Sequence, residues 1–333
     1  MLSSELFMTP AQPGVRARLL PAARWLQSAS RLSVLIFHRV LSEFDPLRPD
    51  EPTEKAFEAR MRWVAANFDV LPLADAIKAL KRDQLPKRAL CITFDDGYAD
   101  NYDLALPILH KLQVPATFFI ATGYLDGGCM FNDIIIEAVR SVQAPIFDLG
   151  ALNLGQYPVA TLEDRRHAIA GIIGQLKYLE PRQRQDLALR AIDCAGTAAP
   201  ADLMMTSEQV AALHADGMEI GAHTVSHPIL AELGLEAARA EIACGRLHLE
   251  ELTGAPVRVF AYPNGQPRHD YHREHVALVH DLGFDGAVST AWGAAHAGAD
   301  LFQIPRFTPW DRSDLRFELR MIGNLWRSSY DIA

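Results

Sequence analysis

The chain has 333 residues, of which 49% are hydrophobic and 22% charged, a composition typical of a folded globular protein and unlike that of a disordered or collagen-like chain. Its formal net charge of −9 argues against a nucleic-acid-binding protein, because phosphate binding requires clustered Lys and Arg. No apolar run is long enough to predict a membrane-spanning helix. The four cysteines are scattered without a CxxC pair, and we interpret them as small buried hydrophobic residues.

Residues 1–32 predict a helical extension that precedes the main domain. Arginines are interleaved here with large apolar residues, the pattern of a helix with one basic and one apolar face. We expect this helix to pack on the domain, and the alternative is a helix that lies on a membrane surface. The segment lacks the unbroken apolar core of a secretory signal, so we expect a cytoplasmic protein, with peripheral membrane association through the basic segment as the alternative.

Short apolar runs, each followed by a polar turn, recur along the chain and predict strands. These cover residues 33–37, 68–71, 89–94, 116–121, 218–222, 257–261, 284–288 and 302–305. Helical patterns lie between most of them, for example at residues 53–67, 73–81, 99–112 and 236–252. Strands that alternate with helices predict a parallel sheet, and seven or eight such units favour a (β/α) barrel.

The alternation is interrupted by about 95 residues between the predicted strands that end at Ala121 and begin at Met218. Helices are predicted near residues 133–142 and 161–179, a third follows Pro181, and Thr206 with Gln209 predicts the capping box of a fourth. We interpret residues from about 126 to 206 as a helical insertion. Because it leaves the carboxyl end of a strand, we expect it to cover the face where parallel barrels carry their active sites.

The first candidate site residues are two adjacent aspartates, Asp95 and Asp96, in the stretch ALCITFDDGYADNY. They directly follow a predicted buried strand, where two neighbouring carboxylates repel each other and lose hydration. A cation would offset this cost. The alternative is an ordinary loop in which one aspartate caps the following helix and the other is solvated.

Two histidines, His223 and His227, follow a later predicted strand in the stretch MEIGAHTVSHPIL. The Thr, Ser and Pro residues around them predict a loop, from which either imidazole can turn toward one point. Alone, such a pair is more typical of surface histidines. Together with one carboxylate, however, two imidazoles form a three-ligand site with a position open for water, the usual form of a hydrolytic zinc centre. The other carboxylate is then available as a base.

The stretches TFDDG (residues 93–97) and HTVSH (residues 223–227) resemble the first two motifs of the polysaccharide deacetylases, carbohydrate esterases that share the NodB homology domain. The resemblance extends over about residues 33–308 and is interrupted by the insertion. It implies a distorted (β/α) barrel, which we assign to residues 33–320 with a tail at 321–333. It also implies metal-dependent removal of acetyl groups, usually from N-acetylated sugars. By motif match, Asp95 is the base, and Asp96, His223 and His227 hold the metal.

The third family motif is only partly present, in the stretch VRVFAYPNGQP. Ala261 lies where the family commonly has an arginine that orients the base, so the orientation of Asp95 must have another source. Asn264 lies where a tyrosine is common, and its backbone amide is a candidate donor to the oxyanion that forms during hydrolysis. Tyr262 is a candidate substrate contact in the same stretch. The alternative is a plain Pro-Asn-Gly turn.

The family's final motif, a Leu-x-His strand end that supplies the general acid, is absent. His38, at the end of the first apolar run, is the candidate substitute, and some related deacetylases resemble this arrangement; a structural histidine is the alternative. Trp310 is a candidate for stacking on a sugar ring, with core packing as its alternative. The histidines between His269 and His280 are interpreted as a solvated helix face, not as a second metal site.

The sequence therefore predicts a metal-dependent hydrolase that removes acetyl groups from N-acetylated sugars of a polysaccharide or glycan, with water activated by the metal and Asp95. Zinc is the expected ion, and cobalt, nickel and manganese also suit these ligands. Because an amide needs its leaving nitrogen protonated and an ester needs this far less, an O-acetyl esterase is an alternative. The other alternative functions are a hydrolase of small amides and a non-catalytic carbohydrate-binding module. An acetylated carbohydrate is the expected partner.

Overall fold

The computed structural model describes residues 31–309, 311, 313–325, 327 and 329–333. Its centre is a curled sheet of eight strands in the order β10-β1-β3-β4-β7-β8-β9, with β2 also paired to β3. The strands are β1 (Arg31–Phe37), β2 (Asp69–Val70), β3 (Ala89–Phe94), β4 (Thr117–Ile120), β7 (Glu219–Ala222), β8 (Val259–Ala261), β9 (Gly286–Val288) and β10 (Ala295–His296). All pairs are parallel except that of β1 with β10. The carboxyl ends of the parallel strands therefore lie at one end of the sheet.

The segment after β10 closes the gap between β9 and β1. The sequence predicts a strand at residues 302–305, but only single bridges form, from Ile304 to Val288 and from Phe307 to Leu35. Pro305 lies between the two bridges and has no N–H to donate to a regular ladder. The result is a distorted (β/α) barrel, as predicted.

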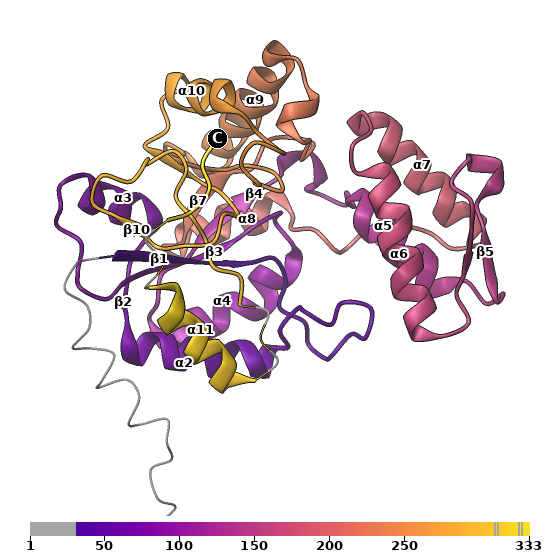
Figure 1. The fold of residues 1–333 in the computed structure, drawn as a ribbon, viewed down its shortest axis with the longest axis horizontal. Helices are drawn as coiled ribbons and strands as arrows, with labels where there is room; N and C mark the ends of the chain where they lie inside the picture. The colour runs from indigo at the N-terminus through magenta and orange to yellow at the C-terminus, as the bar shows by residue number, and fades with distance from the viewer. Residues whose placement is uncertain (1–30, 310, 312, 326, 328) are drawn as a thin grey trace, which may run out of the picture.

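Helices pack around the outside of this sheet (Figure 1). They are α2 (Glu54–Asn67), α3 (Leu73–Lys81), α4 (Leu106–Leu112), α8 (Ser207–Ala215), α9 (Leu235–Thr253), α10 (Arg273–Asp281) and α11 (Asp314–Asn324). The capping box predicted from Thr206 and Gln209 is present at the start of α8. The helix predicted at residues 99–112 is divided, because its first turn, Asn101–Ala105, is a π-helix that leads into α4.

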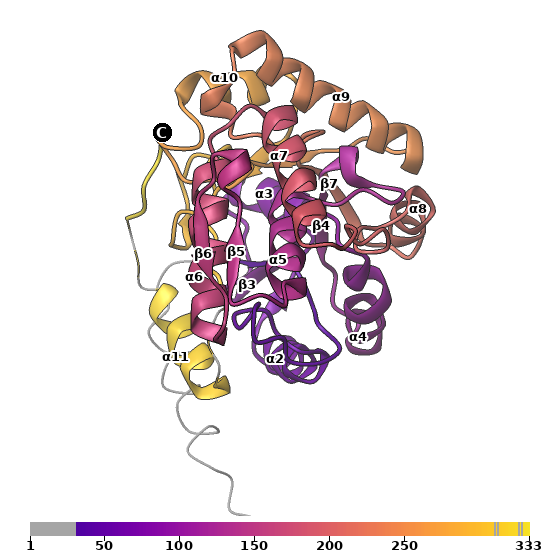
Figure 2. The same ribbon diagram turned by 90° about the vertical axis from the view of Figure 1, so that its right-hand side faces the viewer.

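Most of the residues between β4 and α8 form a lobe that stands beyond the carboxyl ends of the strands, as Figures 1 and 2 show. It contains α5 (Phe131–Ser141), α6 (Leu162–Leu176), α7 (Pro181–Cys194) and a hairpin of β5 (Ile146–Asp148) and β6 (Gln156–Pro158). The lobe has its own hydrophobic core, in which Ile134, Ile172 and Ile192 are buried. The hairpin was not predicted, because each of its strands has only three residues.

The structure moves two predicted boundaries. Arg31 and Leu32 belong to β1, so the barrel begins two residues earlier than predicted, and the rest of the predicted N-terminal extension lies outside the described residues. The boundary predicted at residue 320 falls inside α11. The end of the chain then returns to the barrel, where the Ala333 N–H donates to the Gln303 side chain.

Three side chains are placed differently from the sequence expectation. Cys194 and Cys244 are exposed, not buried. His275 is only 1% exposed, and its Nδ1 accepts a hydrogen bond from the His272 N–H at the start of α10, so this face is not fully solvated.

Within the described part of the chain, no helix combines the length and apolarity needed to cross a membrane.

Candidate metal centre

Asp95 and Asp96 lie in a tight turn at the carboxyl end of β3. The Asp95 N–H donates to the Phe37 carbonyl at 2.9 Å and continues the pairing of β3 with β1. Asp96 and Gly97 both have positive φ angles, +77° and +93°, which aspartate tolerates better than most residues and glycine adopts freely. A Cβ atom at position 97 would lie 3.2 Å from the Ile120 side chain. The sequence DDG therefore suits both the turn and its close approach to β4.

His223 and His227 lie in the loop that follows β7. The Thr224 hydroxyl accepts a hydrogen bond from the His227 N–H at 3.1 Å, and the two imidazole centroids lie 4.7 Å apart. His223 Nδ1 donates to the Ala261 carbonyl at 2.8 Å. Because that nitrogen carries the proton, the other ring nitrogen, Nε2, has the lone pair that can serve as a ligand.

Asp96, His223 and His227 converge at this end of the sheet. Asp96 Oδ1 lies 3.4 Å from Nε2 of His223 and 3.4 Å from Nε2 of His227, and the candidate ligand atoms all lie within 4.8 Å of one another. Oδ1 is buried and makes no hydrogen bond with the residues that the structure describes. A buried, unpaired carboxylate oxygen is unfavourable, and a divalent cation would remove this cost. One carboxylate and two imidazoles fit zinc or a similar ion.

The pKa values reflect the crowding of these groups. Burial alone would raise the pKa of Asp96, but His227 and His223 outweigh it and hold that pKa well below its usual value. Burial lowers the pKa of His227 to about 3, so this imidazole is neutral at physiological pH. Burial would also lower the pKa of His223, but Asp96 and Asp95 together raise it above its ordinary value. A cation at this position therefore competes with a proton on His223.

Asp95 lies beside this cluster and is held separately by Arg306. The Nη1 and Nη2 atoms of Arg306 each donate to one oxygen of Asp95, both at 2.7 Å. Arg306 is fully buried, and its Nε donates to the Ser289 carbonyl. Burial alone would raise the pKa of Asp95, but Arg306 and His223 keep it below its ordinary value. Sequence reasoning left the partner of Asp95 open, and Arg306 is the residue that it missed.

His38 lies at the same end of the sheet. β1 pairs with β3 so that Phe37 is opposite Phe94, which places His38 next to Asp95. The His38 carbonyl accepts a hydrogen bond from the Asn101 side chain at 2.8 Å, which fixes its backbone. The His38 ring lies close enough to both carboxylates that a positive charge on it would lower the pKa of Asp95 and Asp96, in addition to the larger effects of Arg306 and His227.

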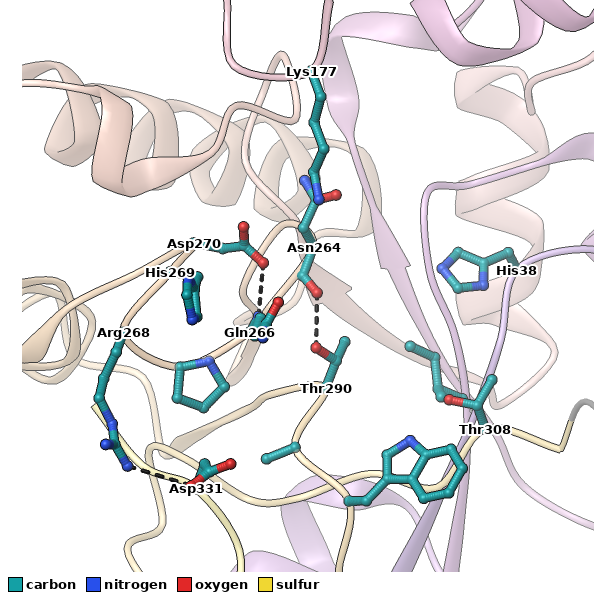
Figure 3. A pocket seen from close by; sticks show the side chains of 14 residues that line it. His38, Lys177, Asn264, Gln266, Arg268, His269, Asp270, Thr290, Thr308 and Asp331 are labelled. Carbon is teal, nitrogen blue, oxygen red and sulfur yellow. Dashed lines mark hydrogen bonds and ion pairs between the residues drawn. The ribbon is translucent and has the colours of Figure 1, made fainter. Parts of the chain in front are cut away.

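A pocket of about 600 Å³ opens at the carboxyl ends of β1, β8 and β9 (Figure 3). His38 forms one wall, and Thr290 and the residues after β8 form another. Lys177, at the end of α6, reaches into the pocket toward Asn264 (Figure 3). The lobe therefore contributes directly to the wall of the pocket.

The remaining candidate residues lie in different surroundings. Asn264 lines the pocket, and its carbonyl accepts a hydrogen bond from the Thr290 hydroxyl at 2.8 Å. Tyr262 is only 1% exposed, its ring stacks on Tyr271, and its hydroxyl donates to the Phe302 carbonyl at 3.1 Å. The structure thus gives Tyr262 a packing role in place of the predicted substrate contact, because its side chain points into the core. Trp310 lies outside the described residues.

Solved structures with low sequence identity share this fold. The Streptococcus pyogenes deacetylase PplD in complex with acetate aligns with a TM-score of 0.59 at 18% identity, over 89% of this chain and 99% of that one. IcaB from Ammonifex degensii aligns with a TM-score of 0.57 at 18% identity, over 89% of this chain and 97% of that one.

Sequence comparisons point to the same group of proteins. The putative polysaccharide deacetylase YxkH of Bacillus subtilis is 22% identical over 286 residues, which are 85% of this chain and 73% of that protein. The poly-beta-1,6-N-acetyl-D-glucosamine N-deacetylase of Staphylococcus epidermidis is 31% identical over 99 residues, only 29% of this chain and 34% of that enzyme. Residues 82–287 match the family model described as polysaccharide deacetylase, and this match covers more than half of the sequence. The chain belongs to the polysaccharide deacetylase family.

Proposed function

We propose that this chain is a metal-dependent hydrolase that removes acetyl groups from N-acetylated sugars of a polysaccharide or glycan. The observation that carries the proposal is the convergence of Asp96, His223 and His227 within 4.8 Å, beside a separately held carboxylate, Asp95. The family and the staphylococcal relative, an N-acetylglucosamine polymer deacetylase by name, support it. Asp96, His223 and His227 would hold the ion, most simply zinc, and cobalt, nickel or manganese also suit these ligands.

A divalent cation bound by these residues would supply Lewis-acid polarisation and a more acidic water. Asp95 then takes the proton of the attacking water. Arg306 keeps the Asp95 carboxylate ionised and oriented, and Asp95 is not one of the three proposed metal ligands. The Asn264 N–H donates to the oxygen that becomes negative as the tetrahedral intermediate forms. His38 donates a proton to the leaving nitrogen from the opposite wall of the pocket.

Release of acetate from matched substrates tests this proposal. The protein is loaded with zinc and mixed with N-acetylglucosamine oligomers, with O-acetylated sugars, and with a small aryl acetamide. We expect free acetate from the N-acetylated oligomers, loss of this activity after chelation, and recovery when zinc is returned. Acetate from the O-acetylated sugars alone would make the chain an esterase, and release from the aryl acetamide alone would make it a small-amide hydrolase. A protein that binds zinc but releases no acetate from any of these would contradict catalysis.

A further inference from the structure

The loop that carries both histidines of the metal centre has a backbone that needs external support. Thr224 and His227 both lie in the left-handed region, with φ angles of +66° and +52°, which is uncommon for residues other than glycine and unfavourable for the β-branched Thr224. Conformations of this kind persist only where the surroundings fix them. The residues that hold this loop therefore determine where the His227 imidazole points.

Helix α9 of the barrel holds the loop from one side. The Glu241 carboxylate accepts hydrogen bonds from the N–H groups of Val225 and Ser226 at 2.9 and 2.8 Å, and from the Ser226 hydroxyl at 2.7 Å. Gly245 lies one turn further along the same face of α9. A Cβ atom there would lie 2.8 Å from the carbonyl carbon and oxygen of Thr224, so only glycine allows this approach.

Helix α7 of the lobe holds the loop from the other side. Arg184 is only 2% exposed, and its Nη2 donates to the carbonyls of Ser226 and His227 at 2.9 and 2.7 Å. Its guanidinium also stacks over the ring of Phe131, at the start of α5, with 4.7 Å to the ring centroid. Arg184 is thus anchored in the lobe and bonded to a candidate metal ligand of the barrel.

The charges of the two supports match the polarity of the loop. The carboxylate meets backbone N–H groups, and the guanidinium meets backbone carbonyls, so each contact is a charge-assisted hydrogen bond. The hydrogen bonds of both side chains end on the loop and not on the candidate ligand atoms. They therefore act on the metal centre through the position of the loop, while the positive charge of Arg184 adds to the burial that lowers the pKa of His227.

We propose that Arg184 and Glu241 are positioning residues that fix His227 for metal binding, and that Arg184 couples the lobe to the metal centre. The inference rests on the proposed function, because it requires a cation at Asp96, His223 and His227. By reciprocity, if the docked lobe strengthens metal binding, then a bound metal strengthens the docking of the lobe. The insertion is then part of the metal site as well as a wall of the pocket.

Metal affinity provides the first test, measured on the full chain by competition between the protein and a chromophoric chelator for zinc. We expect Arg184→Met and Glu241→Gln to bind zinc about 10–100-fold more weakly than the parent protein. Arg184→Lys keeps the charge and one possible hydrogen bond, so its affinity for zinc is expected to lie between those of the parent protein and Arg184→Met. Arg190→Met and Glu251→Gln change exposed residues on the same two helices and serve as matched controls with parent affinity. Far-ultraviolet circular dichroism of the metal-free proteins identifies any variant that fails to fold.

Spectroscopy and hydrogen exchange separate positioning from general stability. The visible spectrum of the cobalt-loaded protein is expected to change in Arg184→Met, because the geometry at the cobalt ion changes. Zinc is expected to slow amide exchange over residues 181–194 in the parent protein but not in Arg184→Met. Parent affinity and spectrum in a folded Arg184→Met would overturn the positioning role. No effect of zinc on exchange in the parent would overturn the coupling, even if Arg184→Met fails to fold. Failure of the parent itself to bind zinc would instead contradict the proposed function.

Discussion

Arg306 and Asp95 are 211 positions apart in the sequence and form two parallel hydrogen bonds of 2.7 Å in the barrel. Both side chains are buried. A bidentate guanidinium–carboxylate pair fixes the plane of the carboxylate as well as its charge. Arg306 therefore orients Asp95, the proposed base, which Ala261 cannot do.

Replacement of Arg306 by Met is expected to damage both stability and catalysis. It leaves the Asp95 carboxylate buried without its partner, which costs about 3–5 kcal/mol of unfolding free energy. Arg306→Lys keeps a charge but not the parallel pair of bonds, so it is expected to fold better and still to lose turnover. Chemical denaturation and acetate release measure the two effects. Full activity in Arg306→Met would show that Asp95 needs no such support.

The pH profile of kcat/KM for Arg306→Lys provides a second measurement. Arg306 lowers the pKa of Asp95, so a weaker contact raises that pKa toward the ordinary value. Because the base must be ionised, the acidic limb of the profile is expected to move to higher pH in the variant. If the acidic limb does not move in the variant, it does not report the ionisation of Asp95.

The two adjacent aspartates are expected to respond differently to substitution. Asp96→Asn removes a proposed metal ligand and is expected to lose both metal and activity, as are His223→Ala and His227→Ala. Asp95→Asn is expected to keep the metal and to lose turnover by a factor of about 10² or more, because it removes a base. Metal analysis of the purified variants checks this division. Asp95→Asn that is folded but free of metal would contradict it.

His38 is expected to matter more for amides than for esters. If it protonates the leaving nitrogen, His38→Ala should lose far more activity on N-acetylated sugars than on an aryl acetate, whose leaving group needs no proton. Metal content should be unchanged. Equal losses on both substrates, with a lower melting temperature, would give His38 only a structural role.

Metal uptake is expected to weaken as the pH falls. The imidazole of His223 must be neutral to bind a cation, and the neighbouring carboxylates raise its pKa above the ordinary value. Affinity for zinc is therefore expected to be full above this raised pKa and to decline as the pH falls through it. Chelator competition at a series of pH values measures the decline. Constant affinity from pH 8 to pH 5 would contradict the expectation.

The sequence predicted the elements that bring the candidate site residues together better than it predicted the partners that support those residues. The strand at residues 89–94 and the helix at residues 73–81 have the predicted bounds, because a continuous apolar run and a strong helical period leave little choice. The turn residues Asp96 and His223 follow predicted strands, and parallel strands bring their ends together.

The residues that escaped prediction depend on contacts distant in sequence. Arg306 follows an apolar segment that was predicted as a strand, which was a usable signal, but nothing local indicates that it meets Asp95. Glu241 looks like any charged residue on a helix, and only the fold brings it to the histidine loop. Tyr262 was misjudged because its motif neighbours line the pocket while its own ring turns into the core.

The lobe also bears on the order in which the protein can form. Its core is local in sequence, whereas β4 pairs with β7 across the whole insertion, for example at Phe118 and Ile220. Local contacts form faster than distant ones, so the lobe is expected to fold before this pairing is complete. During synthesis of the chain, Asp96 is added before the residues of the lobe, and His223 is added after them. A newly synthesised chain can therefore bring Asp96 and His223 together only after the residues of the lobe have been synthesised.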